Sequence, residues 1–251
     1  MIRDITRRIG AGFPAWPGDP PFAAEPFASL ERGDPCDLTR LSLSAHAGTH
    51  LDAPAHVVAG AGRLESIPLD LLVGPAEVVS VPGEAPIPPE ALGGDLLERL
   101  RRGPADPAFP LRLLLRTGSA ETLPALPRAF ASLEERAAEL LARSGVRLIG
   151  IDTPSVDAPS STSLPVHRIL GRAGVAVLEW LDLVEVRAGL WFLVALPLRL
   201  EGVEASPVRA ILMEPGTGAA TERRRGRRRT ASVRGKGSRG STLRPSRSRR
   251  R

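Results

Sequence analysis

The chain of 251 residues is 42% hydrophobic and 25% charged, which is ordinary for a soluble globular protein and allows a sizeable core. Its net charge of +6 misleads, because residues 217–251 hold 14 of the 34 Lys and Arg against one acid, and residues 1–216 carry −7. The single cysteine, Cys36, excludes an intramolecular disulfide, and without a run of about 18 apolar residues or a secretory signal pattern we expect a cytoplasmic protein with no membrane span.

The first predicted strand lies at 37–46, where DLTRLSLSAH alternates between apolar and polar residues. Thr39 and Leu41 would share one face and Arg40 the other, as in a half-buried strand. Such a strand would deliver His46, its last residue, to the polar face.

The following residues, up to about 213, alternate between strands and helices. The predicted strands are rich in Val or Leu and closed by Pro or Gly, and the predicted helices carry an apolar stripe at helical spacing. In chain order they are a strand at 76–81, a helix at 88–102, a strand at 111–118, a helix at 127–145 that ends at Gly145, a strand at 146–152, a helix at 164–174, and strands at 175–180, 190–200 and 206–213. This alternation indicates an α/β fold in one domain, residues 1–214.

The apolar pattern stops near Glu214, and residues 215–251 are basic, rich in Gly and Ser and without aromatic residues. We predict that this tail is disordered. It would bind nucleic acid or an anionic surface only unspecifically, through its charge. A shifted reading frame past a lost stop codon would give the same composition, so a functional basic tail and a shifted frame both stay open.

Three of the four histidines fall within HAGTHLDAPAH, residues 46–56. His50 and Asp52 are two residues apart and can face the same side of an extended segment. Gly48 allows a sharp turn that brings His46 toward them, and a proline then restricts the exit toward the third histidine. Imidazole and carboxylate together suit zinc or manganese.

A metal site of this kind needs ligands from elsewhere in the chain. The fourth histidine, His167, lies on a predicted short helix, and Glu179 ends the apolar strand at 175–180. A buried carboxylate costs roughly several kcal/mol unless it is paired or metal-bound, although a strand-end residue in solvent is the alternative for Glu179.

Six segments together resemble one enzyme family, the bacterial kynurenine formamidases (arylformamidases) within the wider cyclase-like family of metal-dependent hydrolases. They are WPGDPPF, HAGTHLDAPAH, GIDTPSVDA, LPVHRIL, VLEWLDL and ALPLRLEGVEASPVRAIL. The resemblance runs from about Asp4 to Leu212 in the same order. It implies a swivelling β/β/α domain, in homodimers, which agrees with the α/β prediction.

The resemblance implies two zinc ions per subunit, with manganese as the alternative metal. His46, His50 and Asp52 would ligate one ion, and Asp52 would bridge to the second. His167 would bind that second ion, and Glu179 would reach both.

The resemblance also implies the reaction. A water activated by the metals would attack the formyl carbon of N-formyl-L-kynurenine and release formate and L-kynurenine, a step of tryptophan degradation. His56, the histidine left without a metal, would carry the proton, and Trp16 would contact the aromatic part of the substrate. Val57 replaces the aromatic residue that follows this histidine in many relatives, so the pocket wall would differ.

Two alternatives stay open. One is a related hydrolase of a cyclic or aryl amide, such as an isatin-type lactam; the other is a nucleic-acid-binding protein that acts through its basic tail. Asp152, Ser155 and Asp157 would either orient a ligand or serve as turn and cap residues. Cys36 is a weak candidate for a nucleophile, because every histidine already has a role as a metal ligand or as the proton carrier.

Overall fold

Short apolar runs form several of the buried strands of this protein. The computed structural model describes residues 1–81, 83, 86–118, 126 and 129–215. The strands are β1 (Ile2–Asp4), β2 (Ala23–Ala28), β3 (Leu38–Ser42), β4 (His50–Asp52), β5 (Val73–Ser80), β6 (Arg112–Arg116), β7 (Leu148–Ile151), β8 (Ala176–Glu179), β9 (Gly189–Pro197) and β10 (Ala205–Met213). The α-helices are α1 (Leu69–Leu72), α2 (Gly94–Arg102), α3 (Glu135–Ser144) and α4 (Pro165–Arg172).

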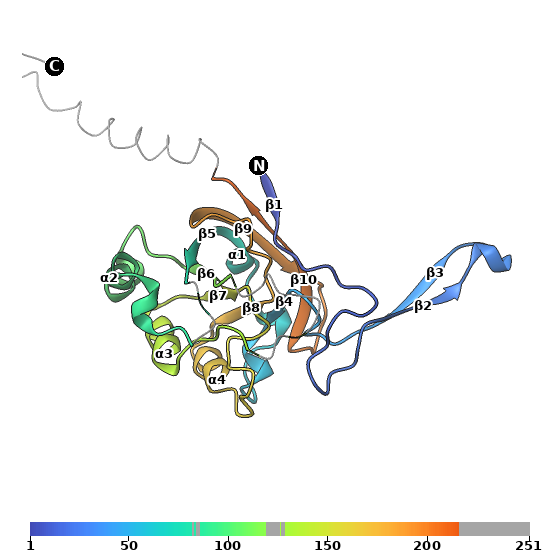
Figure 1. Cartoon of the computed structure of the whole chain (residues 1–251), viewed down its shortest axis with the longest axis horizontal. Helices are drawn as coiled ribbons and strands as arrows, with labels where there is room; N and C mark the ends of the chain where they lie inside the picture. The colour runs from blue at the N-terminus through green and yellow to red at the C-terminus, as the bar shows by residue number, and fades with distance from the viewer. Residues whose placement is uncertain (82, 84–85, 119–125, 127–128, 216–251) are drawn as a thin grey trace, which may run out of the picture. The chain divides into compact units, whose positions relative to one another are not determined.

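Eight of these strands form one sheet in the order β1-β10-β4-β8-β7-β6-β5-β9, and β9 also pairs with β10, so the sheet closes like a barrel. The four neighbours β5, β6, β7 and β8 run parallel. The other pairings are antiparallel. β4 is the antiparallel strand next to β8, and this join between the two parts of the sheet positions the site described below (Figure 1).

The core has two parts because successive side chains of a strand point to opposite faces. Leu114 of β6 belongs to one buried cluster, to which every strand of the sheet except β1 contributes. Its neighbours Leu113 and Leu115 belong to a second cluster, between the sheet and the helices α2, α3 and α4. The fold is therefore a mixed α/β single domain, as the alternation of strands and helices predicts.

The predicted strand at 37–46 is partly wrong. β3 ends at Ser42, four residues before His46, and all its residues are exposed. The physical reason is that, among the described residues, β3 pairs only with β2, in a two-stranded hairpin that extends away from the large sheet (Figure 1). His46 lies instead in a turn that leads into β4.

The two predicted helices at 88–102 and 127–145 are shorter than expected. The first divides into a 3₁₀ helix and α2 at Gly93, whose φ of 85° interrupts the helical path. The second begins only at Glu135, because Leu133 donates its backbone N–H to Val156 and forms a bridge with Ile87. It ends before Gly145, as predicted.

Two predictions fall partly outside the described residues. One is the helix at 127–145, whose first two residues lie outside the described ones. The other is the disordered tail at 215–251, where only Pro215 is described, and it stays a prediction. Within the part of the chain that the structure describes, no helix is long and apolar enough to cross a membrane.

Candidate metal centre

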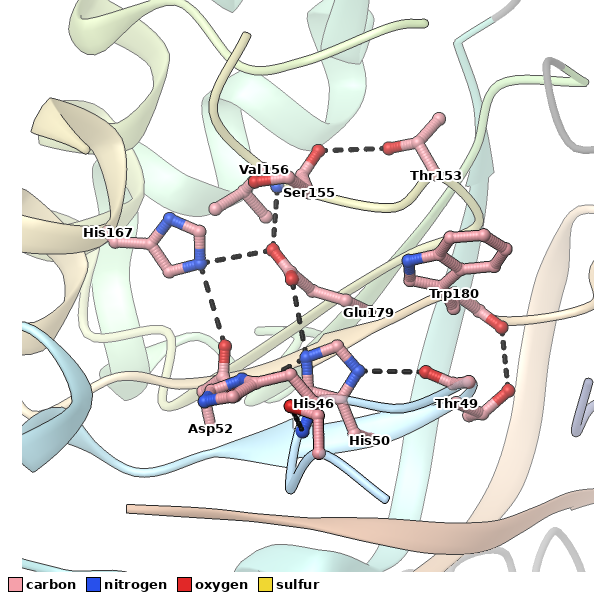
Figure 2. Close-up of polar contacts among 12 residues, drawn as sticks. His46, Thr49, His50, Asp52, Thr153, Ser155, Val156, His167, Glu179 and Trp180 are labelled. Atoms are coloured by element: carbon pink, nitrogen blue, oxygen red, sulfur yellow. Dashed lines mark hydrogen bonds and ion pairs between the residues drawn. The ribbon is translucent and has the colours of Figure 1, made fainter. Parts of the chain in front are cut away.

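Two buried strands that pair antiparallel supply three of the clustered side chains. β4 and β8 are in register with His50 opposite Glu179. His50 and Asp52 leave the same face of β4, whereas Leu51 between them is buried in the core. His50, Asp52 and Glu179 are each at most 4% exposed, so the sheet holds three ionisable groups away from water (Figure 2).

Two histidine rings are held through the nitrogen that faces away from the cluster. His50 Nδ1 lies 2.8 Å from the carbonyl oxygen of Gly48, and His167 Nδ1 lies 2.6 Å from Asp157 Oδ2. A ring that donates from Nδ1 keeps the lone pair of Nε2 for a cation. Asp157 also accepts the backbone N–H groups of Val166 and His167, so it caps α4 and orients the ring at once.

The inward nitrogens lie 3.1–3.6 Å from carboxylate oxygens, and three of the four distances exceed the usual hydrogen-bond range. His50 Nε2 lies 3.4 Å from Asp52 Oδ1 and 3.5 Å from Glu179 Oε2. His167 Nε2 lies 3.6 Å from Asp52 Oδ2 and 3.1 Å from Glu179 Oε1. His46 Nδ1 comes within 2.9 Å of Asp52 Oδ1 but is not aligned for a hydrogen bond, so the contact is an ion pair.

Four buried atoms of this cluster lack a hydrogen bond. Among the described residues, both oxygens of Asp52 and the Nε2 atoms of His50 and His167 are buried without a hydrogen-bond partner. Leaving such groups unsatisfied is costly. All four are ligand atoms that zinc accepts, so the residues present fit a divalent cation.

Two overlapping groups of three residues have ligand atoms within 4.8 Å of one another. They are His46, Asp52 and His56, and His50, Asp52 and Glu179. Asp52 belongs to both groups, so it lies at the centre of the cluster.

His56 lies at the edge of the cluster rather than in the sheet. It ends the 3₁₀ helix Pro54–His56, which begins at the proline that the sequence singles out. Its ring centroid is 4.3 Å from that of His46 and 5.5 Å from that of His167. Burial lowers the pKa of His56, although Asp52 opposes this effect, so the ring is neutral at neutral pH and can accept a proton.

The two carboxylates act on the other histidines in the opposite direction. Burial alone would lower the pKa of His46, but the carboxylates of Asp52, Glu179 and Glu204 together outweigh it and raise that pKa to about 9. The pKa values of His50 and His167 are raised in the same way, against burial, by Asp52 and Glu179. The cluster therefore attracts cations, and protons compete with a metal for it.

The histidines affect the carboxyl groups in turn. Burial would raise the pKa of Asp52 and of Glu179. The charges of His50 and His46 instead lower the pKa of Asp52, and His167 lowers the pKa of Glu179 to about 2. Both carboxylates are thus ionised across the neutral range.

Two residues near the site have strained backbone: one follows Glu179, and the other precedes the helix that carries His167. Trp180, next to Glu179, has a φ of 56°, and Leu164, at the start of α4, has a φ of 48°. The carbonyl oxygen of Trp180 accepts a hydrogen bond of 2.6 Å from Thr49 Oγ1, which connects this strained residue to the chain just before β4 (Figure 2). No sequence pattern predicts these two conformations.

A cavity of about 860 Å³, counted with its open mouth, leads to the cluster. Four aromatic residues line it: Phe13, Trp16, Phe22 and Trp180. Trp16 packs edge-on against Phe130, with ring centroids 6.4 Å apart, and Phe13 lies 5.1 Å from Trp180. An aromatic cavity with a few convergent polar groups is typical of a small-molecule site.

The structure brings all seven candidate residues to one place. Six lie in the cluster, and the seventh, Trp16, lies in the cavity wall; the six are His46, His50, Asp52, His56, His167 and Glu179. Cys36 is exposed, and it does not line the cavity.

The sequence gives Asp152, Ser155 and Asp157 two alternative roles, in the site or in turns and caps, and the structure differs for each of them. Asp157 orients His167 and also caps α4, so both interpretations apply to it. Asp152 holds a turn instead, since it accepts hydrogen bonds from Thr117. Ser155 lines the cavity.

Sequence reasoning missed Glu204, whose Oε1 lies 3.5 Å from His46 Nε2, because no spacing connects it to the histidine segment.

Comparisons with known proteins agree with this geometry. Residues 3–158 match the model of a family described as putative cyclase. A kynurenine formamidase of Paracidovorax citrulli (strain AAC00-1) is 38% identical over 220 residues, which cover 86% of this chain and 97% of that protein.

Solved structures give the same picture. A potential metal-dependent hydrolase with cyclase activity has 29% identity and a TM-score of 0.70, over 86% of this chain and 99% of its own. Isatin hydrolase A from Labrenzia aggregata, bound to benzyl benzoate, has 25% identity and a TM-score of 0.72, over 85% and 93%.

Proposed function

The chain belongs to the putative cyclase family, and we propose that it is a metal-dependent hydrolase that converts N-formyl-L-kynurenine to L-kynurenine and formate. The observation that carries the proposal is the group of buried, unpartnered imidazole and carboxylate atoms in an aromatic cavity. The 38% identity to a kynurenine formamidase supports the substrate. We also propose that the fold is the swivelling β/β/α domain that the resemblance implies.

Zinc is the metal we propose, with manganese as the alternative and two ions per subunit. His46, His50 and Asp52 would hold one ion; Asp52 and Glu179 would reach both, and His167 the second. When bound, such ions lower the pKa of water and polarise a carbonyl group. Asp157 and Gly48 support the proposal because they aim His167 and His50 inward.

His56 is the proposed proton carrier. Its lowered pKa leaves a neutral ring that can take a proton from the attacking water and deliver it to the departing aniline nitrogen. Trp16, in the cavity wall, would pack against the aromatic ring of the substrate and hold the formamide toward the cluster.

The direct test is kynurenine release from N-formyl-L-kynurenine by the purified protein, with and without a chelator. We expect turnover that the chelator removes and added zinc or manganese restores. No release at any metal loading would contradict the proposal. Isatin is the second substrate to test, because the structural similarity to an isatin hydrolase favours a lactam as the alternative.

The role of His56 has its own test. His56→Ala should lower kcat by about 10²- to 10⁴-fold, the usual contribution of a positioned general acid or base, while metal content stays nearly unchanged. Loss of metal would instead make His56 a ligand, with His46 and Asp52.

A homodimer is part of the proposal. The β2–β3 hairpin exposes large apolar side chains that a second copy would cover: Phe27 (63% exposed), Leu30 (59%), Leu38 (51%) and Leu41 (61%). Sedimentation measurements should give twice the monomer mass, and Phe27→Asp with Leu41→Asp should shift it toward the monomer.

The proposal gives the arginine-rich segment no part in catalysis. A chain without residues 217–251 should turn over the substrate at the rate of the full chain. A large loss would show that the segment belongs to the enzyme, and salt-dependent retention on DNA by the full chain alone would support the unspecific binding.

A further inference from the structure

Asp19 is the charged residue of the cavity wall that the proposed metal centre does not use. It lines the cavity together with Trp16 and Phe22, in the segment AWPGDPPF. The other ionisable residues that line the cavity are the histidines and Glu179 of the cluster. Within the described ranges, neither Lys nor Arg lines it. Outside the cluster, the ionisable group of the cavity lining is therefore the Asp19 carboxylate, with no described Lys or Arg beside it in the lining.

Two hydrogen bonds fix the position of Asp19. Its backbone N–H donates to the carbonyl oxygen of Trp16 at 2.9 Å, which closes a turn. Its Oδ2 accepts a hydrogen bond of 2.8 Å from Ser44 Oγ, and Ser44 Oγ in turn accepts the backbone N–H of His46 at 3.1 Å. Ser44 thus connects the carboxylate to the turn that carries His46, so Asp19 keeps a set distance from the cluster.

The carboxylate of Asp19 keeps acceptor capacity for a ligand. An ionised carboxylate has about four acceptor positions. Ser44 occupies one of them, and the structure places no other hydrogen bond on this side chain among the described residues. Asp19 is half-buried, so a hydrogen bond to a charged donor there is less exposed to water than one on the surface.

We propose that Asp19 binds the ammonium group of an aryl formamide substrate and so selects an amino-acid substrate over a neutral lactam. The inference rests on the proposed function, because N-formyl-L-kynurenine carries this ammonium on the chain attached to its aromatic ring. The rings of Trp16 and Phe22 in the same cavity also favour a cation. An anionic aryl formamide would meet the carboxylate without a compensating Lys or Arg.

The contact between Asp19 and the ammonium group is the same in the bound substrate and in the transition state, so it should lower KM. Binding energy present equally in the ground state and the transition state lowers KM and leaves kcat unchanged. Asp19 is on this argument a specificity-determining residue that takes no part in bond breaking.

The experiment compares two substrates on two proteins. The substrates are N-formyl-L-kynurenine and its deamino analogue, in which hydrogen replaces the ammonium group. We expect the wild-type protein to prefer the first by about tenfold to a hundredfold in kcat/KM, the usual effect of one hydrogen bond to a charged group. Asp19→Asn should remove most of this preference through KM, because it weakens binding of the ammonium group and also relieves the repulsion of the deamino analogue, which keeps its carboxylate and is an anion. The kcat of each substrate should change by less than about twofold.

A matched control removes the same charge elsewhere. Asp95→Asn lies on α2, where the Asp95 side chain is 87% exposed and pairs with Arg99, and it should leave both rates unchanged. If Asp19→Asn slows both substrates equally, Asp19 acts only through the turn at Trp16 and the proposal is wrong. It is also wrong if the wild-type protein handles both substrates alike.

A binding measurement separates this inference from the proposed function. Calorimetric titration with L-kynurenine and its deamino analogue needs no turnover and is done on the wild-type protein, so it stands even if Asp19→Asn fails to fold. Tighter binding of L-kynurenine without hydrolysis of either formamide would reject the activity and retain the subsite. Equal binding together with hydrolysis would reject the subsite and retain the activity.

Discussion

Two buried aspartates, Asp52 on β4 and Asp152 directly after β7, have the same burial and opposite surroundings. They are 3% and 2% exposed. The carboxylate of Asp152 accepts the backbone N–H and hydroxyl of Thr117 and the backbone N–H of Gly118, at 2.7–3.2 Å. Asp52 accepts no hydrogen bond within the described part of the chain, and its neighbours are imidazole nitrogens.

The difference between the two carboxylates lies in the groups that stabilise their charge. Burial raises the pKa of Asp152 despite its donors, whereas the charged histidines lower the pKa of Asp52. Backbone and hydroxyl donors stabilise a carboxylate without any further group, so Asp152 is structural. Imidazole nitrogens stabilise one only when they carry protons or share a metal with it, which supports the proposal that Asp52 belongs to a metal centre.

The largest effect is expected from Asp52→Asn. The substitution keeps the shape and removes the charge that both groups of potential ligands share. We expect bound metal to fall to a small fraction of the wild-type content, and kcat/KM to fall by roughly 10³-fold or more, since metal ions contribute several kcal/mol to such reactions. Elemental analysis and kynurenine release measure the two quantities. Normal metal content in this variant would break the comparison.

Asp157→Asn should have an intermediate effect. Asp157 contacts the ring of His167 but not the cluster itself, so its loss frees the ring to rotate. Removing such a partner typically weakens metal affinity by 10- to 100-fold. Competition with a chromogenic chelator measures this affinity, and circular dichroism checks that α4, which Asp157 caps, is still formed. An affinity equal to that of the wild type would make Asp157 a helix cap alone.

A pH titration of the chelator-treated protein should show a smaller effect. The pKa of His46 is about 9 in the folded chain and about 6.5 in an unfolded one, so its protonated form contributes stability that is complete below about pH 6.5. This contribution is lost as the pH rises through about 9, on the order of 1 kcal/mol or more. Urea unfolding between pH 6 and 9.5 measures it.

The metal-loaded protein is the control for that titration. Under the proposed ligand set, metal binding requires that His46, His50 and His167 lose their protons, so stabilisation by metal should grow over the same pH range. Parallel curves for loaded and chelated protein would contradict the view that protons and metal compete for one cluster.

The sequence predicts the parts of the fold that local patterns determine. Runs such as LRLLLR give β6, and the stripe before Gly145 gives α3. Local patterns could not show that β3 pairs only with β2, because burial depends on which strands are neighbours. The short strand β4 was missed because three residues with two polar ones carry too little periodicity.

The histidine segment and the resemblance together predict the members of the site, but the spacing does not predict its arrangement. The antiparallel pairing that sets His50 opposite Glu179 connects residues far apart in the chain. The strained φ of Trp180 and the contact of Glu204 with His46 also arise from tertiary packing. Likewise the contrast between Asp52 and Asp152 is invisible in the sequence, where both follow apolar residues.

The smallest effect on the site is expected from Asp152→Asn. An amide keeps one acceptor oxygen for Thr117 but turns an NH₂ group toward N–H donors, so stability should fall by about 1–3 kcal/mol, or by several degrees in Tm. Metal content and kcat/KM should stay within about twofold of the wild type, because no ligand atom moves. Calorimetric unfolding with elemental analysis checks both. Loss of metal in this variant, as in Asp52→Asn, would contradict the comparison. It would mean that hydrogen bonds from the protein do not distinguish a structural carboxylate from a metal ligand, and they could then no longer support Asp52 as a ligand.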